Sequence, residues 1–108
     1  MVSDQRLQPT FTRDLATAVI EAVEQDATGV LHLTAAGACS WLEFTEAIFE
    51  LAGIDVPIEA VTTSGPVDRP LNGVLGRGRA DALGLTPLRD WREALADYMA
   101  LAGYVATA

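Results

Sequence analysis

The chain has 108 residues, which is room for one domain. Half of its residues are apolar and 20% are charged, a composition typical of a folded protein rather than a disordered one. Seven basic and fifteen acidic residues give a net charge of -8 at pH 7, and all seven basic residues are arginine. The absence of lysine excludes any chemistry that needs a lysine amine. The acidic balance argues against partners such as nucleic acid or an anionic membrane surface.

The cysteine content, the length of the apolar runs and the first residues indicate in which cellular compartment the protein is expected. Cys39 is the single cysteine, so the chain cannot form an internal disulfide. No apolar run approaches the roughly 20 residues that span a bilayer, and the start MVSDQRLQ lacks the features of a signal peptide. We therefore expect a cytoplasmic protein with no membrane span.

The first half of the chain predicts a helix and a short strand. Apolar residues recur at helical spacing from Leu15 to Val23, which favours an amphipathic helix over residues 12–26. The apolar run from Val30 to Thr34 follows Gly29, and its β-branched ends indicate a buried strand over residues 30–34.

The clearest local signal is the start of a second helix. Ser40 and Glu43 have the spacing of a capping box, in which each side chain accepts a hydrogen bond from the other residue's backbone N–H. The apolar face that follows and the stop at Gly53 predict a helix over residues 40–52. Alternation from Val56 to Thr63 then suggests another strand.

Glycine and proline interrupt the chain between Thr62 and Arg79, so this stretch is expected to be an irregular, extended connection. A single helical turn over 81–83 and a last helix over 88–102 complete the prediction. The fold class is therefore α/β, as an α+β-like fragment with three main helices and two or three short strands. Because so small a sheet is marginal alone, the chain is expected to be part of something larger or to associate.

Most candidate catalytic residues have a structural explanation. His32 is the sole histidine, which excludes a histidine cluster for a metal, and it is expected to be a partly buried strand residue. Cys39 lacks a neighbouring histidine and is interpreted as a small structural residue. Trp41 and Trp91 lie on apolar stripes and are expected in the core. The arginines of the Gly76–Arg79 stretch make a weak phosphate-loop motif, because no clear strand precedes it.

Two polar segments are harder to explain as ordinary solvent-exposed loops. One runs from Ser3 to Gln5 and is followed by Pro9 and Thr10. The other, from Asp68 to Asn72, holds a guanidinium and an amide in a rigid stretch. A guanidinium suits phosphate oxygens and an amide can orient a sugar hydroxyl, although hydrogen bonds that fix the loop explain the same residues.

With these segments, the chain resembles the dTDP-4-dehydrorhamnose reductase family over essentially its whole length. The matching blocks occur in the family's order and at about its spacing: Val2–Gln5, Pro9–Thr10, Arg13–Ala16, Gly29–Thr34, Ser40–Phe44, Ala47–Ile48, Glu50–Gly53, Arg69–Asn72 and Asp90–Leu95. The family comprises NAD(P)-dependent reductases of the extended short-chain dehydrogenase type. They reduce a keto group of dTDP-4-dehydro-L-rhamnose to form dTDP-L-rhamnose.

The resemblance covers the carboxy-terminal third of such an enzyme. It implies that residues 1–108 form a single C-terminal substrate-binding domain, without the cofactor-binding Rossmann domain. The family's Gly-rich fingerprint and Tyr-x-x-x-Lys pair do not occur here, since Tyr98 and Tyr104 have no lysine four residues on. We therefore expect no catalytic residue and no bound cofactor in this chain. NAD(P)H is implied for the complete enzyme, with the Rossmann part supplied in cis or in trans.

The resemblance also implies a substrate side for the two polar segments. The residues expected to border the cleft for a dTDP-sugar are Asp4, Gln5, Thr10, Arg69, Pro70 and Asn72. Arg69 is expected at the diphosphate, and Asn72 or Gln5 at polar groups of the sugar or base.

Three departures from the family pattern favour an alternative. The family usually has Gly where Leu7 stands, often Arg where Asp68 stands and often Ser where Gly73 stands. The alternative is a non-catalytic interaction module that kept the fold and lost the ligand. A related epimerase or reductase acting on another nucleotide sugar is a third possibility.

In the parent fold, residues 30–34 are expected to join the edge of the dinucleotide-binding sheet. A chain without that sheet would leave this edge unpaired, so we expect it to self-associate through the exposed strand.

Overall fold

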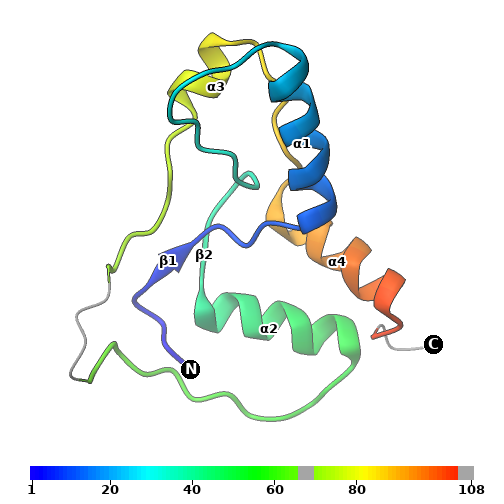
Figure 1. The fold of residues 1–108 in the computed structure, drawn as a ribbon. Helices are drawn as coiled ribbons and strands as arrows, with labels where there is room; N and C mark the ends of the chain where they lie inside the picture. Colours follow the sequence, from blue (N-terminus) through cyan, green and yellow to red (C-terminus); the bar gives the residue numbers. More distant parts are fainter. Residues whose placement is uncertain (66–69, 105–108) are drawn as a thin grey trace.

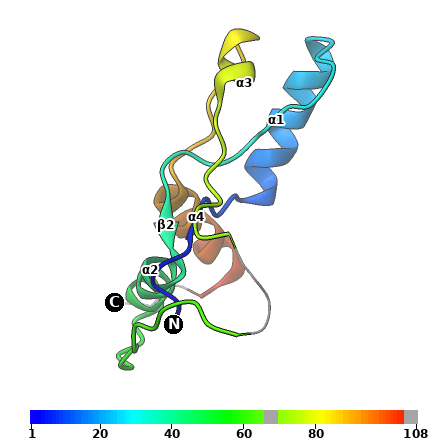
Figure 2. The ribbon, with the colours of Figure 1, turned by 90° about the vertical axis from the view of Figure 1, so that its left-hand side faces the viewer.

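The computed structural model describes residues 1–65 and 70–104. Its elements, shown in Figure 1, are in chain order β1 (Arg6–Leu7), α1 (Thr12–Glu24), β2 (Cys39–Ser40), α2 (Trp41–Ala52), α3 (Gly78–Ala82) and α4 (Trp91–Ala102). Figures 1 and 2 agree in placing α1 and α3 at one end and α2 and α4 at the other. The fold is therefore an α+β fragment with the three main helices that were predicted.

The molecule is flat and extended for its length. Its principal extents are 47 × 41 × 18 Å and its Cα radius of gyration is 16.1 Å. A compact domain of this length would have a radius of gyration of about 13 Å. The chain thus builds a thin layer with a small core rather than a sphere.

Helix α2 begins where the sequence predicted. Ser40 Oγ accepts from the Glu43 N–H at 3.1 Å, and Glu43 Oε1 accepts from the Ser40 N–H at 2.9 Å, so both halves of the capping box are formed. Gly53 ends the helix with φ +69°, a conformation that a residue without a Cβ adopts at little cost. The same Ser40 pairs with Arg6 in the antiparallel β1–β2 sheet, which ties the start of α2 to the N-terminal segment.

The main core lies between α2 and α4. Asp90 caps α4 by accepting from the Arg92 N–H at 3.0 Å, so this helix begins at Trp91, three residues after the predicted start. Buried residues of the main core are Ala35, Cys39, Ala47, Trp91, Leu95 and Met99. Trp91 and Cys39 are thus core residues, as predicted.

A second, smaller cluster holds α1 and α3 together. Its buried members are Ala22, Ala80 and Leu85, with Ala27, Leu31, Leu33 and Leu83 packed against them. Helix α1 buries its alanine side, whereas Val19, Ile20 and Val23 are 46%, 59% and 70% exposed. The predicted apolar stripe of this helix therefore lies mostly in solvent, because no other described element covers it. Helix α3 also differs from prediction, since it begins at Gly78 rather than Asp81.

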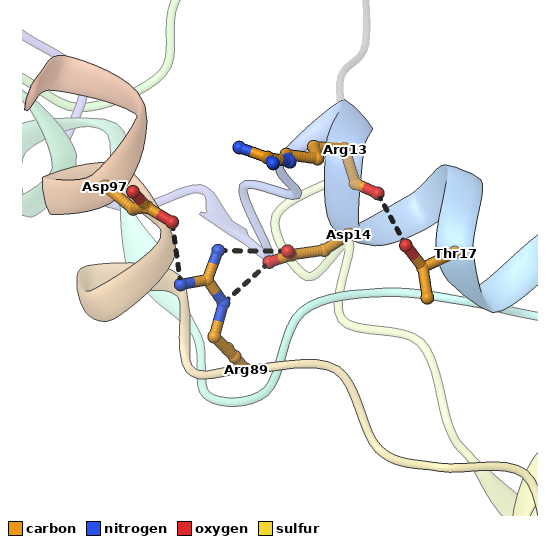
Figure 3. Close-up of polar contacts among 5 residues, drawn as sticks. All are labelled: Arg13, Asp14, Thr17, Arg89 and Asp97. Atoms are coloured by element: carbon orange, nitrogen blue, oxygen red, sulfur yellow. Dashed lines mark hydrogen bonds and ion pairs between the residues drawn. The ribbon is translucent and has the colours of Figure 1, made fainter. Parts of the chain in front are cut away.

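One arginine joins the two ends of the molecule. Figure 3 shows Arg89 donating from Nη2 and Nε to both carboxylate oxygens of Asp14, at 2.9 and 3.1 Å, and from Nη1 to Asp97 Oδ2 at 3.0 Å. Asp14 belongs to α1 and Asp97 to α4. These hydrogen bonds, to Asp14 first and then to Asp97, raise the pKa of Arg89. The guanidinium thus links the start of α1 to α4 through three hydrogen bonds.

Both predicted strands are wrong. Residues 30–34 form no strand, because within the described chain they have no neighbouring strand with which to form a ladder. Residues 56–63 contribute only an isolated parallel bridge between Val61 and Val2. The two strands observed are two residues each and lie elsewhere. His32 is exposed rather than partly buried, since it belongs to this unpaired stretch.

Candidate functional site

The N-terminal segment that precedes α1 pairs with other stretches of the chain on both of its sides, and the candidate site forms around it. On one side, its strand β1 pairs with β2. On the other side, the Arg6 N–H donates to the Leu71 carbonyl at 2.7 Å and the Gly73 N–H donates to the Arg6 carbonyl at 2.8 Å. At the beginning of the segment, the Val61 N–H donates to the Met1 carbonyl and the Ser3 N–H donates to the Val61 carbonyl, each at 2.9 Å. Two stretches that lie far apart in sequence, near residues 4 and 72, are therefore neighbours (Figure 1).

Asp4 and Gln5 are held by a residue that the sequence did not single out. Thr63 donates to Asp4 from its N–H, at 2.9 Å to Oδ1 and 3.0 Å to Oδ2, and from its hydroxyl to Oδ1 at 2.5 Å. These bonds, the hydroxyl bond first, lower the pKa of Asp4 because they stabilise the carboxylate. Gln5 donates from Nε2 to Thr63 Oγ1 at 3.1 Å and accepts from the Trp41 indole N–H at 3.3 Å.

Trp41 differs from its predicted place. Its residue surface is 41% exposed, and its ring lies edge-to-face with Phe44 at a centroid distance of 6.3 Å. The first residue of α2 is therefore beside the N-terminal segment rather than in the core. Its position on the helical apolar stripe predicted burial. The stripe alone could not reveal that Gln5 offers the indole a polar partner at the protein surface.

Thr10 lies farther along the N-terminal segment, just before α1. Its hydroxyl donates to the Gln8 carbonyl at 2.9 Å and accepts from the Ala35 N–H at 3.1 Å. Gln8 crosses between three segments: Nε2 donates to the carbonyls of Ala35 and Gly37, at 3.3 and 3.2 Å, and Oε1 accepts from the Leu75 N–H at 2.8 Å. Gln8 was not among the predicted site residues, although its side chain links the stretch Ala35–Gly37 to the stretch that contains Leu75.

The second predicted segment is only partly described. Arg69 and Asp68 lie outside the described residues. Pro70 is exposed, and the exposed Asn72 accepts from the Val74 N–H through Oδ1 at 3.1 Å. Gly73 leaves space for close approach of the chains, since a Cβ at this position would be 3.2 Å from the Arg6 carbonyl oxygen. The structure thus pairs Asn72 with Arg6, the residue after Gln5, and gives Asp4, Gln5 and Thr10 hydrogen bonds within the chain.

Two apolar pockets open along the junction of α2 and α4. The first, of about 360 Å³, is lined by aromatic and small residues from three segments: Pro9, Thr10, Phe11, Thr12, Phe44, Trp91, Ala94, Leu95 and Tyr98. The second, of about 500 Å³, shares Phe44, Leu95 and Tyr98 with the first. Phe11 and Tyr98 meet edge-to-face with centroids 5.6 Å apart. Sequence reasoning missed these pockets, although the aromatic spacing on both helices was visible.

Metal-ligating side chains and the single thiol are two features that bear on the chemistry of the site. Among residues 1–65 and 70–104, no group of three or more His, Cys, Asp or Glu side chains is placed to hold a metal ion. Burial first, and then the Glu43 carboxylate, raise the pKa of Cys39 to about 11, so its thiol stays protonated.

In the part of the chain that the structure covers, no helix combines the length and hydrophobicity needed to cross a bilayer.

Comparison with known proteins gives a consistent result. The family model described as "RmlD substrate binding domain" matches residues 1–103. A spore coat polysaccharide biosynthesis protein SpsK of Bacillus subtilis is 41% identical over 102 residues, which are 92% of this chain and 35% of that protein. A dTDP-4-dehydrorhamnose reductase of Mycolicibacterium smegmatis is 41% identical over 107 residues, covering 93% of this chain and 32% of its own length.

Solved structures match the same region. A dTDP-4-dehydrorhamnose reductase from Clostridium acetobutylicum superimposes with a TM-score of 0.88 at 34% identity, over 95% of this chain and 39% of its own. The enzyme of the same name from Bacillus anthracis, solved in complex with NADP, has a TM-score of 0.87 at 26% identity, over 93% of this chain and 37% of its own. The chain therefore spans about a third of the length of the relatives it matches.

Proposed function

This chain belongs to the RmlD substrate binding domain family, and we propose that it forms the sugar-nucleotide side of a reductase cleft. We propose that residues 1–108 act as one substrate-binding unit, and the family match over residues 1–103 supports this. The relatives that bear the name dTDP-4-dehydrorhamnose reductase are about three times as long. A cofactor-binding part, joined in cis or supplied in trans, completes the cleft.

The proposed ligand is a dTDP-sugar, and one observation carries its placement. The Arg6 backbone binds Leu71 and Gly73, and this pairing brings together the two polar segments that the sequence singled out. Asp4 and Gln5 bind Thr63, so their proposed part is to shape the wall of the cleft. The Gln5 amide and the Trp41 indole bound to it then face the ligand.

The remaining contacts follow from side-chain chemistry. Asn72 is exposed at the junction, where its amide can meet a hydroxyl of the sugar. Arg69, three residues earlier, is proposed to pair with the diphosphate through its guanidinium fork, and Pro70 holds the intervening backbone. Thr10, whose hydroxyl already has two partners, is proposed to line the cleft with its methyl group.

The reduction itself requires residues that this chain does not contain. Hydride transfer needs a nicotinamide and a proton donor beside the ketone. The 108 residues include no lysine and no Gly-rich fingerprint after a strand, so they do not fit the nicotinamide cofactor. We assign NAD(P)H to the cofactor-binding part. The residues of this chain bind and orient the sugar nucleotide.

Binding of the nucleotide tests this function directly. We expect saturable heat on titrating the chain with dTDP and with dTDP-rhamnose. The Arg69→Ala variant should lose this signal, whereas Arg13→Ala, which removes an exposed arginine from α1, should retain it. Absence of binding by the unaltered chain, or equal loss in both variants, would contradict the proposal.

A non-catalytic interaction module is the second candidate. It is favoured by the apolar face of α1, where Val19, Ile20 and Val23 lie in solvent. It is also favoured by the departures from the family pattern at Leu7, Asp68 and Gly73. A chain that binds no dTDP-sugar but retains a specific protein partner would support this candidate.

The proposed surroundings of the chain follow from its charge and its thiol. A net charge of -8 opposes binding to nucleic acid or to an anionic membrane surface. Cys39 is a free, buried cysteine, which suits a reducing compartment, and we propose the cytoplasm.

A further inference from the structure

Four side chains around the start of the N-terminal segment form one continuous series of hydrogen bonds. The Trp41 indole N–H donates to Gln5 Oε1 at 3.3 Å, and Gln5 Nε2 donates to Thr63 Oγ1 at 3.1 Å. The Thr63 hydroxyl then donates to Asp4 Oδ1 at 2.5 Å. Each bond joins two residues of this chain, so the series needs no group from another part of a longer protein.

The direction of these hydrogen bonds is fixed at both ends. An indole N–H can only donate, and an ionised carboxylate can only accept. Asp4 is ionised at pH 7, because the hydrogen bonds from Thr63 lower its pKa. The Thr63 proton must therefore point to Asp4, and its oxygen accepts from Gln5. The Gln5 amide thus has one orientation, with its oxygen toward Trp41 and its nitrogen toward Thr63.

The reversed orientation of the amide would lose both of its hydrogen bonds. Gln5 Nε2 would face the Trp41 indole N–H, a donor against a donor, and Oε1 would face a hydroxyl whose proton is already given to Asp4. Within residues 1–65 and 70–104, the amide uses one of its two N–H groups and one of its two lone pairs. The other N–H and lone pair have fixed directions, and they suit a ligand group that both accepts and donates.

Thr63 differs from both of its neighbours in the sequence. It is half-buried, whereas Thr62 and Ser64 are exposed. Its N–H donates to both carboxylate oxygens of Asp4, at 2.9 and 3.0 Å. The backbone thus binds the carboxylate independently of the hydroxyl, and the hydroxyl supplies the link from Asp4 to Gln5. A valine at this position would keep the backbone hydrogen bonds and lose the link.

We infer that Thr63 is a positioning residue for the sugar nucleotide, because it holds the Gln5 amide in one orientation toward the ligand. The inference rests on the proposed function, since a dTDP-sugar is the ligand that the amide would meet. Thr63 acts through Gln5 rather than by contact with the ligand. Its hydroxyl supplies one of the two hydrogen bonds that orient the amide, so its loss should weaken nucleotide binding by about 5-fold, the usual effect of one neutral hydrogen bond.

The affinity for dTDP-rhamnose, measured by titration calorimetry, tests the inference with closely matched variants. We expect Thr63→Val to raise the Kd about 5-fold, and Thr63→Ser, which keeps the hydroxyl, to stay within about 2-fold of the unaltered chain. Thr62→Val is the matched control, because it makes the same change at an exposed neighbour and should leave the Kd unchanged. Circular dichroism should show the same helix content in all three variants.

Removal of Gln5 separates an effect through the amide from an effect on the loop. If Thr63 acts through Gln5, Thr63→Val should not raise the Kd further in a Gln5→Ala background. An equal rise with and without Gln5 would overturn the inference. So would an unchanged Kd of Thr63→Val, or weak binding by Thr63→Ser.

Proton exchange of the Gln5 side-chain amide gives a readout that needs no ligand. In the ¹⁵N-labelled chain, we expect the amide proton that Thr63 accepts to exchange with water at least ~5-fold faster in Thr63→Val than in the unaltered chain or in Thr63→Ser. The Gln8 amide, which donates to the carbonyls of Ala35 and Gly37, is the internal control and should not change.

The two readouts distinguish this inference from the function on which it rests. An unaltered chain that binds no dTDP-sugar would refute the proposed function, whereas faster exchange in Thr63→Val would still establish Thr63 as the residue that orients Gln5. Unchanged exchange in Thr63→Val would overturn the inference, whatever the chain binds.

Discussion

Ser40→Ala should destabilise the protein measurably, because it removes one half of the capping box at the start of α2. Ser40 is 4% exposed, so water cannot replace the hydroxyl that accepts from the Glu43 N–H at 3.1 Å. Loss of an N-cap costs about 1 kcal/mol, and the burial of this one places it at about 1–2 kcal/mol. For a domain of this size, that corresponds to a fall in Tm of roughly 5–15 °C.

Urea and thermal unfolding followed by circular dichroism would measure the change. Ser64→Ala is the matched control, since Ser64 is exposed, and it should alter the free energy of unfolding by less than about 0.5 kcal/mol. Glu43→Gln retains an acceptor for the Ser40 N–H and should cost little, whereas Glu43→Ala should couple with Ser40→Ala in a double-mutant cycle. A loss below about 0.3 kcal/mol for Ser40→Ala, or simple additivity of the two alanine variants, would refute the reasoning.

Three further predictions follow from single groups. Because burial raises the pKa of Cys39 to about 11, its thiol should not react with a disulfide reagent at pH 8 until the protein unfolds; rapid labelling of the folded chain would contradict this. The pKa of Asp4 is lowered by Thr63, so its stabilisation is present above about pH 4 and lost as the pH falls through the folded pKa. Acid titration of unfolding should therefore be steeper for the unaltered protein than for Asp4→Asn, and identical slopes would exclude the effect. Gly37→Ala should cost about 1–3 kcal/mol in urea unfolding, because φ is +76° and the new Cβ would lie 2.5 Å from Asp90 Oδ1; a neutral result would mean that the α4 cap shifts freely.

Signals carried by neighbouring residues predicted the fold well. The capping box and Gly53 located α2 to within a residue. The last helix was predicted from its apolar stripe, but its start was placed three residues early because the cap formed by Asp90 was not recognised. Local chemistry decides these helix ends, since the partners of each cap lie two or three residues away.

Features that depend on distant residues could not be predicted. Residues 30–34 have the composition of a strand, but a strand exists only where a second one pairs with it, and none of the described segments does so. The Arg89–Asp14 pair spans 75 positions, and no local pattern indicates it.

The candidate site shows the same division. Polar composition singled out the two segments that contain Asp4, Gln5 and Asn72. It did not identify Thr63, which holds the first two from 59 and 58 positions away. Nor did it show that Trp41 lies at the surface beside Gln5.

The central claim is that this chain supplies the sugar-nucleotide wall of a cleft, at the junction of its N-terminal segment with residues 70–73. Amide chemical shifts of the ¹⁵N-labelled chain, followed during titration with dTDP-rhamnose, test it most directly. The account predicts saturable shifts at Gln5, Asn72 and Gly73 and at the indole N–H of Trp41. Shifts confined to α1 and α3, or a spectrum unchanged at millimolar nucleotide, would contradict it.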